Sequence, residues 1–393
     1  MSARYYIGIE GFCMRHSVAV LADADGTILS SCRTPETLSV HTTSPTRLLD
    51  RFVNLLWAVF ERAGLTIDAL SHSVICAGIS GVTFPYDQIQ ILPSSLSSIA
   101  TDAHKLICTG DAEVTFAAYT QSHSGSLILS HSGSTAYAVG TGRTGVQHFR
   151  FGGWGPALGD EGSGVWIGRE GLRAIGQEHD RRLPDSVLWE EVSAWLEKPN
   201  TGSLAWGIAS KNWQIQLERF KRSRQRKSDL DPRTLLYAFA HQSDVNDDDD
   251  IWRKAAAGIA IPVIAAARRS DRAATEIVNR AIGHLSDQHE GVCDVAKDAG
   301  VASFSPVVLY GGILNHNPEI RARLCSILQA RLGPHCTFLT NDDARTMRPA
   351  LGALLFALGD STDDELRLPP PSVIERVREC HKRHEFYGDL IND

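Results

Sequence analysis

The sequence lacks the segments that would place the chain in a membrane or export it. No apolar run approaches the roughly 20 residues needed to span a bilayer. The N-terminal stretch MSARYYIGIEG enters an apolar strand pattern at once, without the charged region, apolar region and cleavage site of a signal peptide. We therefore expect a cytoplasmic protein with no membrane partner.

Clustered cysteines and a strong excess of one charge are also missing. The eight cysteines are scattered without a CxxC pair, which argues for reduced thiols and against a zinc site. The formal net charge of -7 gives no electrostatic footprint for nucleic acid. What remains is a globular chain of 393 residues, 43% hydrophobic and long enough for two domains.

Two common nucleotide-binding motifs are absent or misplaced. No GxxxxGK[ST] string occurs anywhere in the sequence, which excludes a P-loop. The only GxGxxG string, Gly140 to Gly145, joins two predicted strands instead of opening a helix. A Rossmann dehydrogenase is therefore disfavoured.

Strand and helix patterns start twice along the chain, each time with a hairpin-rich block. The first block predicts strands at Tyr5–Ile9, Ser17–Ala22, Thr27–Ser31, Ser73–Ala77 and Lys105–Cys108, with helices at Pro45–Ala63 and Ala112–Tyr119. The second predicts strands at Ser126–Ser130, Thr135–Val139, Gln147–Phe151 and Pro306–Tyr310, with helices at Ala255–Ala267, Arg272–Ser286, Pro318–Arg331 and Ala350–Leu358. This order predicts an α/β protein with mixed sheets and indicates an internal duplication.

Glycine-containing turns follow four of the predicted strands. They are Glu10 to His16, Gly110-Asp111, His131 to Ser134 and Gly311-Gly312. Backbone amides at such turns can point at phosphate oxygens, and glycine lets the ligand approach closely. The four turns together favour a phosphate-containing ligand.

Two carboxylates and two tryptophans near these turns each allow two interpretations. Asp111 ends a strand, so it could take a proton from a hydroxyl that attacks phosphorus, or it could cap the helix that follows. Asp160 lies among glycines just before the helix expected from Ser163, and it is also either functional or a cap. Trp154 and Trp166 could stack on a sugar or belong to the core.

The string FGGWGPALGDEGSGVWIGREGL, residues 151–172, resembles the signature of the N-acetylglucosamine kinase family and its BadF/BadG-type ATPase relatives. CTGDAEVTFAAY, VVLYGGILNHNPEIRARL and RPALGALLFAL resemble further segments of that family. The resemblance implies two ribonuclease H-like domains of the actin and hexokinase type around an interdomain cleft. We expect these domains at 1–121 and 122–368, with a helical or loop insertion at about 178–250 and a C-terminal helix at 370–390 that completes the first domain.

The resemblance also implies an activity, which is the ATP-dependent phosphorylation of an amino sugar. N-acetyl-D-glucosamine converted to its 6-phosphate is the leading reaction, with ATP and Mg²⁺ as cofactors and the sugar as the partner. Asp111 would be the general base that takes the proton of the 6-hydroxyl. The implied sugar-binding residues are Gly153, Trp154, Gly155, Asp160, Ser80 and His41, and the implied nucleotide-binding residues are Gly11, Arg15, Ser132, Gly133, Ser134, Gly311 and Gly312.

The first phosphate loop departs from the family pattern. The family reads close to DGGGTKT where this chain reads Glu10 to His16 (EGFCMRH), so only Gly11 and a cation, Arg15, survive. Glu10 would take the place of the family's aspartate that faces the metal ion. His41 stands where the family has an asparagine, and it either replaces that hydrogen bond or is a surface histidine.

These departures leave three functional alternatives. The chain could be an amino-sugar kinase, or a non-catalytic kinase-like protein that binds an amino sugar or another metabolite. It could also be an ATPase that drives a partner enzyme, although the scattered cysteines do not fit the iron-sulfur site of such activators. A homodimer is compatible with the sequence.

Overall fold

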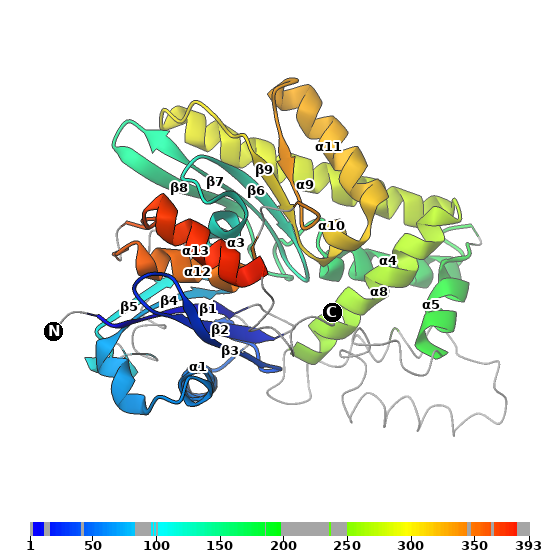
Figure 1. The fold of residues 1–393 in the computed structure, drawn as a ribbon. Coiled ribbons are helices and arrows are strands. Elements are labelled where there is room, and N and C mark those ends of the chain that lie inside the picture. Colours follow the sequence, from blue (N-terminus) through cyan, green and yellow to red (C-terminus); the bar gives the residue numbers. More distant parts are fainter. Residues whose placement is uncertain are drawn as a thin grey trace, which may run out of the picture.

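The computed structural model describes residues 3–11, 16–40, 43–82, 96, 98–99, 101–184, 186–197, 236, 250–343, 347–362 and 365–382. Two five-stranded mixed sheets dominate these residues (Figure 1). The first sheet contains β1 (Tyr5–Gly11), β2 (Ser17–Ala22), β3 (Ile28–Thr34), β4 (Ser73–Ile79) and β5 (Lys105–Thr109). The second contains β6 (Gly125–Ser130), β7 (Ser134–Gly142), β8 (Gly145–Gly152), β9 (Val307–Tyr310) and β10 (Phe338–Leu339). The predicted α/β class with mixed sheets is confirmed.

The two sheets share one topology. The first has the order β3-β2-β1-β4-β5 and the second the order β8-β7-β6-β9-β10. In each sheet the first three strands form an antiparallel meander, and the last two run parallel to the first strand. This repetition supports the internal duplication that the two hairpin-rich starts indicate. The string Gly140 to Gly145 lies in the β7–β8 hairpin, as predicted.

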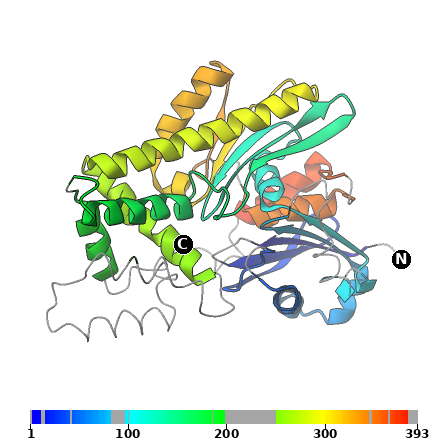
Figure 2. The ribbon, with the colours of Figure 1, turned by 180° about the vertical axis from the view of Figure 1, so that it is seen from behind.

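Long helices cover the outer faces of both sheets. On the first sheet, α1 (Pro45–Arg62) and the 3-10 helix η1 (Ile67–His72) bury Phe52 and Phe60 against Ile7 and Ile9. On the second sheet, α9 (Arg272–Asp298) crosses the outer face of the strands, with α11 (Pro318–Leu332) beside it (Figure 2). Each sheet therefore has an apolar layer on its outer side, which fixes its register.

The helices between the two sheets come from both halves of the chain (Figure 1). They are α3 (Asp111–Thr120), α12 (Pro349–Leu358) and α13 (Pro371–Lys382). Residues of α12 pack on the first sheet, where a Cβ at Gly8 of β1 would lie 2.3 Å from the carbonyl oxygen of Ala350. Phe116 of α3 packs instead on Tyr137 of the second sheet, with ring centroids 5.6 Å apart. Each half thus supplies a helix to the sheet of the other half.

The proposed domain limits place α12 in the second domain, although it covers the first sheet. Helix α13 also lies against the first sheet, because Val377 packs beside Gly26 in the β2–β3 turn. The division at residues 121 and 122 and the limit at residue 368 remain predictions.

A group of helices extends the second half at the end of its sheet. It consists of α4 (Gly164–His179), α5 (Leu188–Glu197) and α8 (Asp250–Arg268), with the short α10 (Gly312–His316) following β9 (Figure 2). Helices α4 and α8 meet at Gly168, where a Cβ would lie 1.8 Å from the carbonyl oxygen of Ala256. Helix α5 falls within the predicted insertion at 178–250, whose remaining part lies mostly outside the described residues.

Several sequence-based helix limits were wrong. Helix α8 begins at Asp250, five residues before the predicted start at Ala255. Helix α9 continues to Asp298 beyond the predicted end at Ser286, because Val292 and Ala296 keep burying its apolar face. Among the described residues, no helix combines the length and the apolar character that crossing a membrane requires.

Candidate functional site

A cavity of about 310 Å³ lies between the two halves of the chain. Ser80, Gly81 and Asp111 line it from the first half, and the other lining residues come from the second half. The second half contributes the β6–β7 turn, the segment after β8, one face of α8 and the start of α10. Its volume lies at the small end of the range of small-molecule sites.

Asp111 begins helix α3 directly after β5, at the carboxyl end of a parallel strand. The N-cap of α3 is Gly110 and has no side-chain hydrogen bond, so the interpretation of Asp111 as the cap was wrong. The Asp111 side chain lines the cavity and is 9% exposed, while its backbone oxygen accepts a hydrogen bond of 2.7 Å from Thr115 Oγ1. A nearly buried carboxylate at the edge of a sheet is thereby available to the cavity.

The predicted second phosphate loop is the tight β6–β7 turn. Ser132, Gly133 and Ser134 line the cavity, and the backbone amide of His131 donates to Gly133 O at 2.9 Å. The imidazole of His131 reaches the other phosphate turn, because its Nδ1 accepts the amide of Gly312 at 3.2 Å. This histidine connects two turns that both border the cavity.

Asp160 connects its own segment, which follows β8 from Gly153 onward, to the β6–β7 turn. Its carboxylate accepts hydrogen bonds from the backbone amides of Ser134 and Gly155, and its side chain lines the cavity. The residue is 3% exposed and has φ of 59°, a conformation that Asp tolerates better than most residues. Ser163 caps α4 by accepting the amide of Trp166, so the interpretation of Asp160 as the cap was wrong.

The residues around Asp160 divide between the cavity and the surface. Gly153 and Gly155 line the cavity, both with positive φ. Trp154 is 74% exposed and does not belong to the described cavity wall. Trp166 is buried, packs on His284 and lies under the guanidinium of Arg280, so it is a core residue.

Three further predicted residues are not among the lining residues of the cavity, and two lie outside the described residues. Ser80 lines it, but Glu10, Gly11 and Gly311 are not among the lining residues. Gly11 ends β1 against Leu38, and Gly311 adopts φ of 117° where a Cβ would lie 2.2 Å from Ser130 O. Arg15 and His41 lie outside the described residues, as does most of the first phosphate loop.

Glu10 lies at the N-terminus of α12. Its Oε2 accepts the amide of Ala350 at 2.9 Å, where the partial positive charge of the helix favours a carboxylate. Burial nevertheless raises the pKa of Glu10 from 4.5 to about 7, because the amide of Ala350 and the charges of Arg348 and Arg33 oppose the rise only in part. One oxygen of the expected metal-side carboxylate is thus already engaged with the protein.

Replacing Glu10 by Gln is expected to stabilise the protein more at pH 8 than at pH 4.5. The unfolded chain releases the Glu10 proton near pH 4.5 and the folded protein near pH 7, so wild-type stability falls as the pH rises through this window. The free energies of unfolding of Glu10→Gln and wild type should differ by about 3 kcal/mol more at pH 8 than at pH 4.5. Urea denaturation at both pH values measures this difference.

The exposed Glu36→Gln variant is the control, for which no such change is expected. An equal difference between wild type and Glu10→Gln at the two pH values would contradict the effect.

Sequence analysis missed the cationic face of α8. Arg253 and Lys254 line the cavity one turn before Ala257 and Gly258, and Arg268 lies at the far end of the same helix face. The spacing of three to four residues along this face was visible, but the predicted helix began at Ala255 and so left out both Arg253 and Lys254. With Arg150 of β8, four cations and two carboxylates, those of Asp111 and Asp160, line the cavity, so it favours an anionic ligand.

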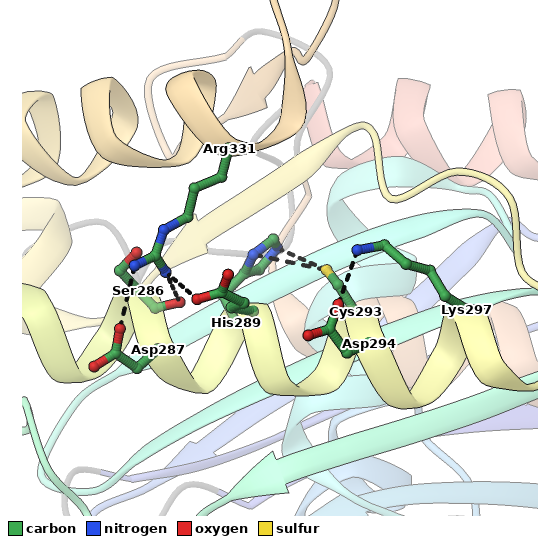
Figure 3. A network of polar contacts seen from close by, with 8 residues as sticks. Ser286, Asp287, His289, Cys293, Asp294, Lys297 and Arg331 are labelled. Carbon is green, nitrogen blue, oxygen red and sulfur yellow. Dashed lines mark hydrogen bonds and ion pairs between the residues drawn. The ribbon is translucent and has the colours of Figure 1, made fainter.

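A second polar cluster, on α9, is structural (Figure 3). The imidazole of His289 lies 3.7 Å from the Sγ of Cys293 and 2.8 Å from the Oγ of Ser126. Burial lowers the pKa of His289 to about 4 and raises that of Cys293 to about 12. A neutral thiol beside a neutral imidazole is not an activated nucleophile, so this cluster holds α9 on β6 and has no sign of thiol catalysis.

The cavity fits a nucleotide better than a protein-bound metal. Glycine amides and cationic side chains surround it, as phosphate groups require. In the described ranges, no group of three or more His, Cys, Asp or Glu side chains could hold a metal ion. Mg²⁺ in nucleotide sites is held by one or two carboxylates together with substrate phosphates, so this arrangement is compatible with Mg²⁺ that arrives with a nucleotide.

Two curated relatives match part of the chain. The N-acetylmuramic acid/N-acetylglucosamine kinase of Clostridium acetobutylicum is 26% identical over 195 residues, which is 49% of this chain and 60% of that protein. The N-acetyl-D-glucosamine kinase of Dictyostelium discoideum is 30% identical over 141 residues, which is 33% of this chain and 43% of that protein. The chain thus matches about half the length of these relatives.

Solved structures and a family match cover much more of the chain. A provisionally named N-acetylglucosamine kinase of Chromobacterium violaceum has a TM-score of 0.59 at 20% identity and covers 91% of this chain and 100% of that chain. A similarly named protein of Porphyromonas gingivalis has a TM-score of 0.50 at 13% identity, with 91% and 99% covered. The structural similarity shows a shared fold. Residues 16–357 match the model of one protein family, described as the BadF/BadG/BcrA/BcrD ATPase family. The chain belongs to the BadF/BadG/BcrA/BcrD ATPase family.

Proposed function

We propose that this protein is an ATP-dependent kinase of an amino sugar, with N-acetyl-D-glucosamine as the leading acceptor and its 6-phosphate as the product. The observation that carries the proposal is that Asp111 lines one cavity together with Asp160, the β6–β7 turn and two glycines, Gly153 and Gly155. The names of the two curated relatives support the substrate class.

In the proposed reaction, the oxygen of the sugar 6-hydroxyl attacks the γ-phosphorus of ATP. Asp111 accepts the hydroxyl proton as the new O–P bond forms, and the bond between the γ-phosphorus and the bridging oxygen breaks to release ADP. Gly153, Gly155 and Asp160 position the sugar, and the amides of Ser132 and Gly133 donate to phosphate oxygens. Mg²⁺, when bound with the nucleotide, neutralises charge on the phosphates.

Two further residue assignments belong to this proposal. Gly312 borders the cavity at the start of α10, where it would lie against the adenosine. Glu10 is the proposed carboxylate on the Mg²⁺ side of the nucleotide. Its Oε2 already accepts the amide of Ala350. A sugar acceptor in the cytoplasm and a homodimer remain predictions from the sequence.

The first phosphate loop supports a second candidate, a protein that binds the amino sugar without transferring phosphate. Glu10 to His16 contains one glycine, and its Phe12 and Met14 side chains would keep phosphate farther from the backbone than glycine does. Nucleotide binding therefore separates the two candidates.

The test measures binding and turnover with the same protein preparation. Isothermal titration with N-acetylglucosamine and, separately, with a non-hydrolysable ATP analogue and Mg²⁺ should show both ligands binding. A coupled assay should show ADP release that depends on the sugar, with N-acetylmuramic acid and glucose as comparison acceptors. Sugar binding without nucleotide binding would support the second candidate and contradict the kinase.

A further inference from the structure

Arg253 is a buried cation on the wall of the cavity. It is 5% exposed, and it lines the cavity from the first turns of α8. Within the part of the chain that the structure describes, its Nε has no hydrogen-bond partner. A buried guanidinium normally uses its five N–H donors, and an unused one is costly.

The carboxylate nearest to Arg253 does not satisfy it. Arg253 Nη2 lies 3.9 Å from Asp160 Oδ2, which is an ion pair but too long for a hydrogen bond. Asp160 instead accepts the amides of Ser134 and Gly155. Asp160 therefore holds the guanidinium electrostatically and leaves its donors for another acceptor.

Other arginines of the cavity are engaged with the protein. Arg150 donates to Val82 O at 3.2 Å, to Thr135 Oγ1 at 3.3 Å and to Gly153 O at 3.4 Å, so it joins the two halves of the chain. Arg268 donates to Asn317 Oδ1 at 2.7 Å and to Glu319 Oε1 at 2.8 Å. Among the contacts of the described residues, Arg253 is thus the arginine of this wall with the fewest donors engaged.

Resting on the proposed function, we propose that Arg253, held by Asp160, binds the terminal phosphoryl group of the nucleotide. A guanidinium matches two phosphate oxygens with parallel N–H donors, and it cannot lose its charge. Its neighbours fit this role, because the β6–β7 turn and Asp111 line the same cavity. Arg253 adds positive charge and directed donors to a site whose first phosphate loop, Glu10 to His16, contains one glycine.

The test compares nucleotides that differ in their phosphates. Dissociation constants of AMP, ADP and a non-hydrolysable ATP analogue, each with Mg²⁺, are measured by isothermal titration for wild type, Arg253→Gln and Arg253→Lys. Arg253→Gln should weaken the ATP analogue about 10- to 100-fold, as the loss of charge-assisted hydrogen bonds does, and leave AMP within about 2-fold. Arg253→Lys should recover part of the affinity, since it keeps the charge without the fork of donors.

Arg269→Gln is the control, because Arg269 directly follows the same helix, is not among the lining residues of the cavity and is engaged with Glu190 and Glu191. Relative to wild type, its dissociation constants for AMP and for the ATP analogue should change by the same factor or not at all. A circular dichroism spectrum that matches wild type shows that each variant is folded.

Three results would overturn the role of Arg253. They are an unchanged affinity for the ATP analogue, an equal loss for AMP and the analogue, and a loss confined to a carboxylated amino sugar, which would make Arg253 an acceptor residue. If Arg253→Gln does not fold, the comparison rests on Arg253→Lys, for which unchanged discrimination would have the same meaning. Wild-type protein that binds no nucleotide would instead overturn the proposed function itself.

Discussion

Asp111→Asn is expected to lower kcat for phosphotransfer about 10²- to 10⁴-fold, the usual contribution of a general base. Asparagine has nearly the same shape as aspartate, but it cannot take the proton of the attacking hydroxyl. The substitution leaves the backbone contact with Thr115 intact, since that hydrogen bond uses the main-chain oxygen of Asp111. KM for sugar and for ATP should therefore stay within about 3-fold, because the interaction lost is made in the transition state.

Steady-state kinetics of ADP release measures this effect. The control is Asp287→Asn, an exposed aspartate of α9 that pairs with Arg331 of α11, is not among the lining residues of the cavity and should leave kcat unchanged. An Asp111→Asn enzyme that keeps more than about a tenth of wild-type kcat would show that another group accepts the proton.

Asp160→Ala is expected to destabilise the protein by about 3–5 kcal/mol, the usual cost of removing one partner from a buried ion pair. The substitution leaves the guanidinium of Arg253 without its carboxylate, and both side chains are at least nine-tenths buried. It also removes the acceptor of the Ser134 and Gly155 amides. Alanine at φ of 59° adds backbone strain that aspartate tolerates better.

Two companion variants separate these causes. Asp160→Asn keeps an oxygen for the two amides and tolerates the positive φ, so it should lose less stability than Asp160→Ala. The double variant Asp160→Ala and Arg253→Met removes both charges and should recover part of the loss. Denaturant unfolding monitored by circular dichroism gives the free energies. Arg253→Met alone is measured as well. If the double variant loses as much stability as Asp160→Ala and Arg253→Met lose together, the two residues do not interact.

The sequence predicted the sheets and their mixed directions because those features depend on local patterns. Alternating and buried apolar runs predicted the strands. Three of the four predicted glycine-containing turns, at Asp111, at His131 to Ser134 and at Gly312, supply lining residues of the cavity. The family of the chain is also confirmed, from the string around Asp160. The local sequence pattern was sufficient to predict those elements whose structure depends on their own residues.

Features that depend on distant packing were not predictable in the same way. Nothing in the segment of α12 shows that it covers the first sheet, since that depends on Gly8 leaving room for Ala350. Arg253 gained significance only when α8 placed it beside Asp160. The cap assignments of Asp111 and Asp160 failed because glycine and serine at neighbouring positions hold the cap sites instead.

The exchange of helices between the halves has a consequence for the synthesis of the chain. The first sheet is translated early, but its inner cover, α12 and α13, is made only near the end. At ordinary translation rates the strands wait on the order of tens of seconds for that cover. During this time the groove at Gly8 is open to solvent, and the nascent first half is a natural client for chaperones that bind apolar surface. A gene fragment ending after α3 should give insoluble protein, and co-expression with the remaining fragment should restore solubility.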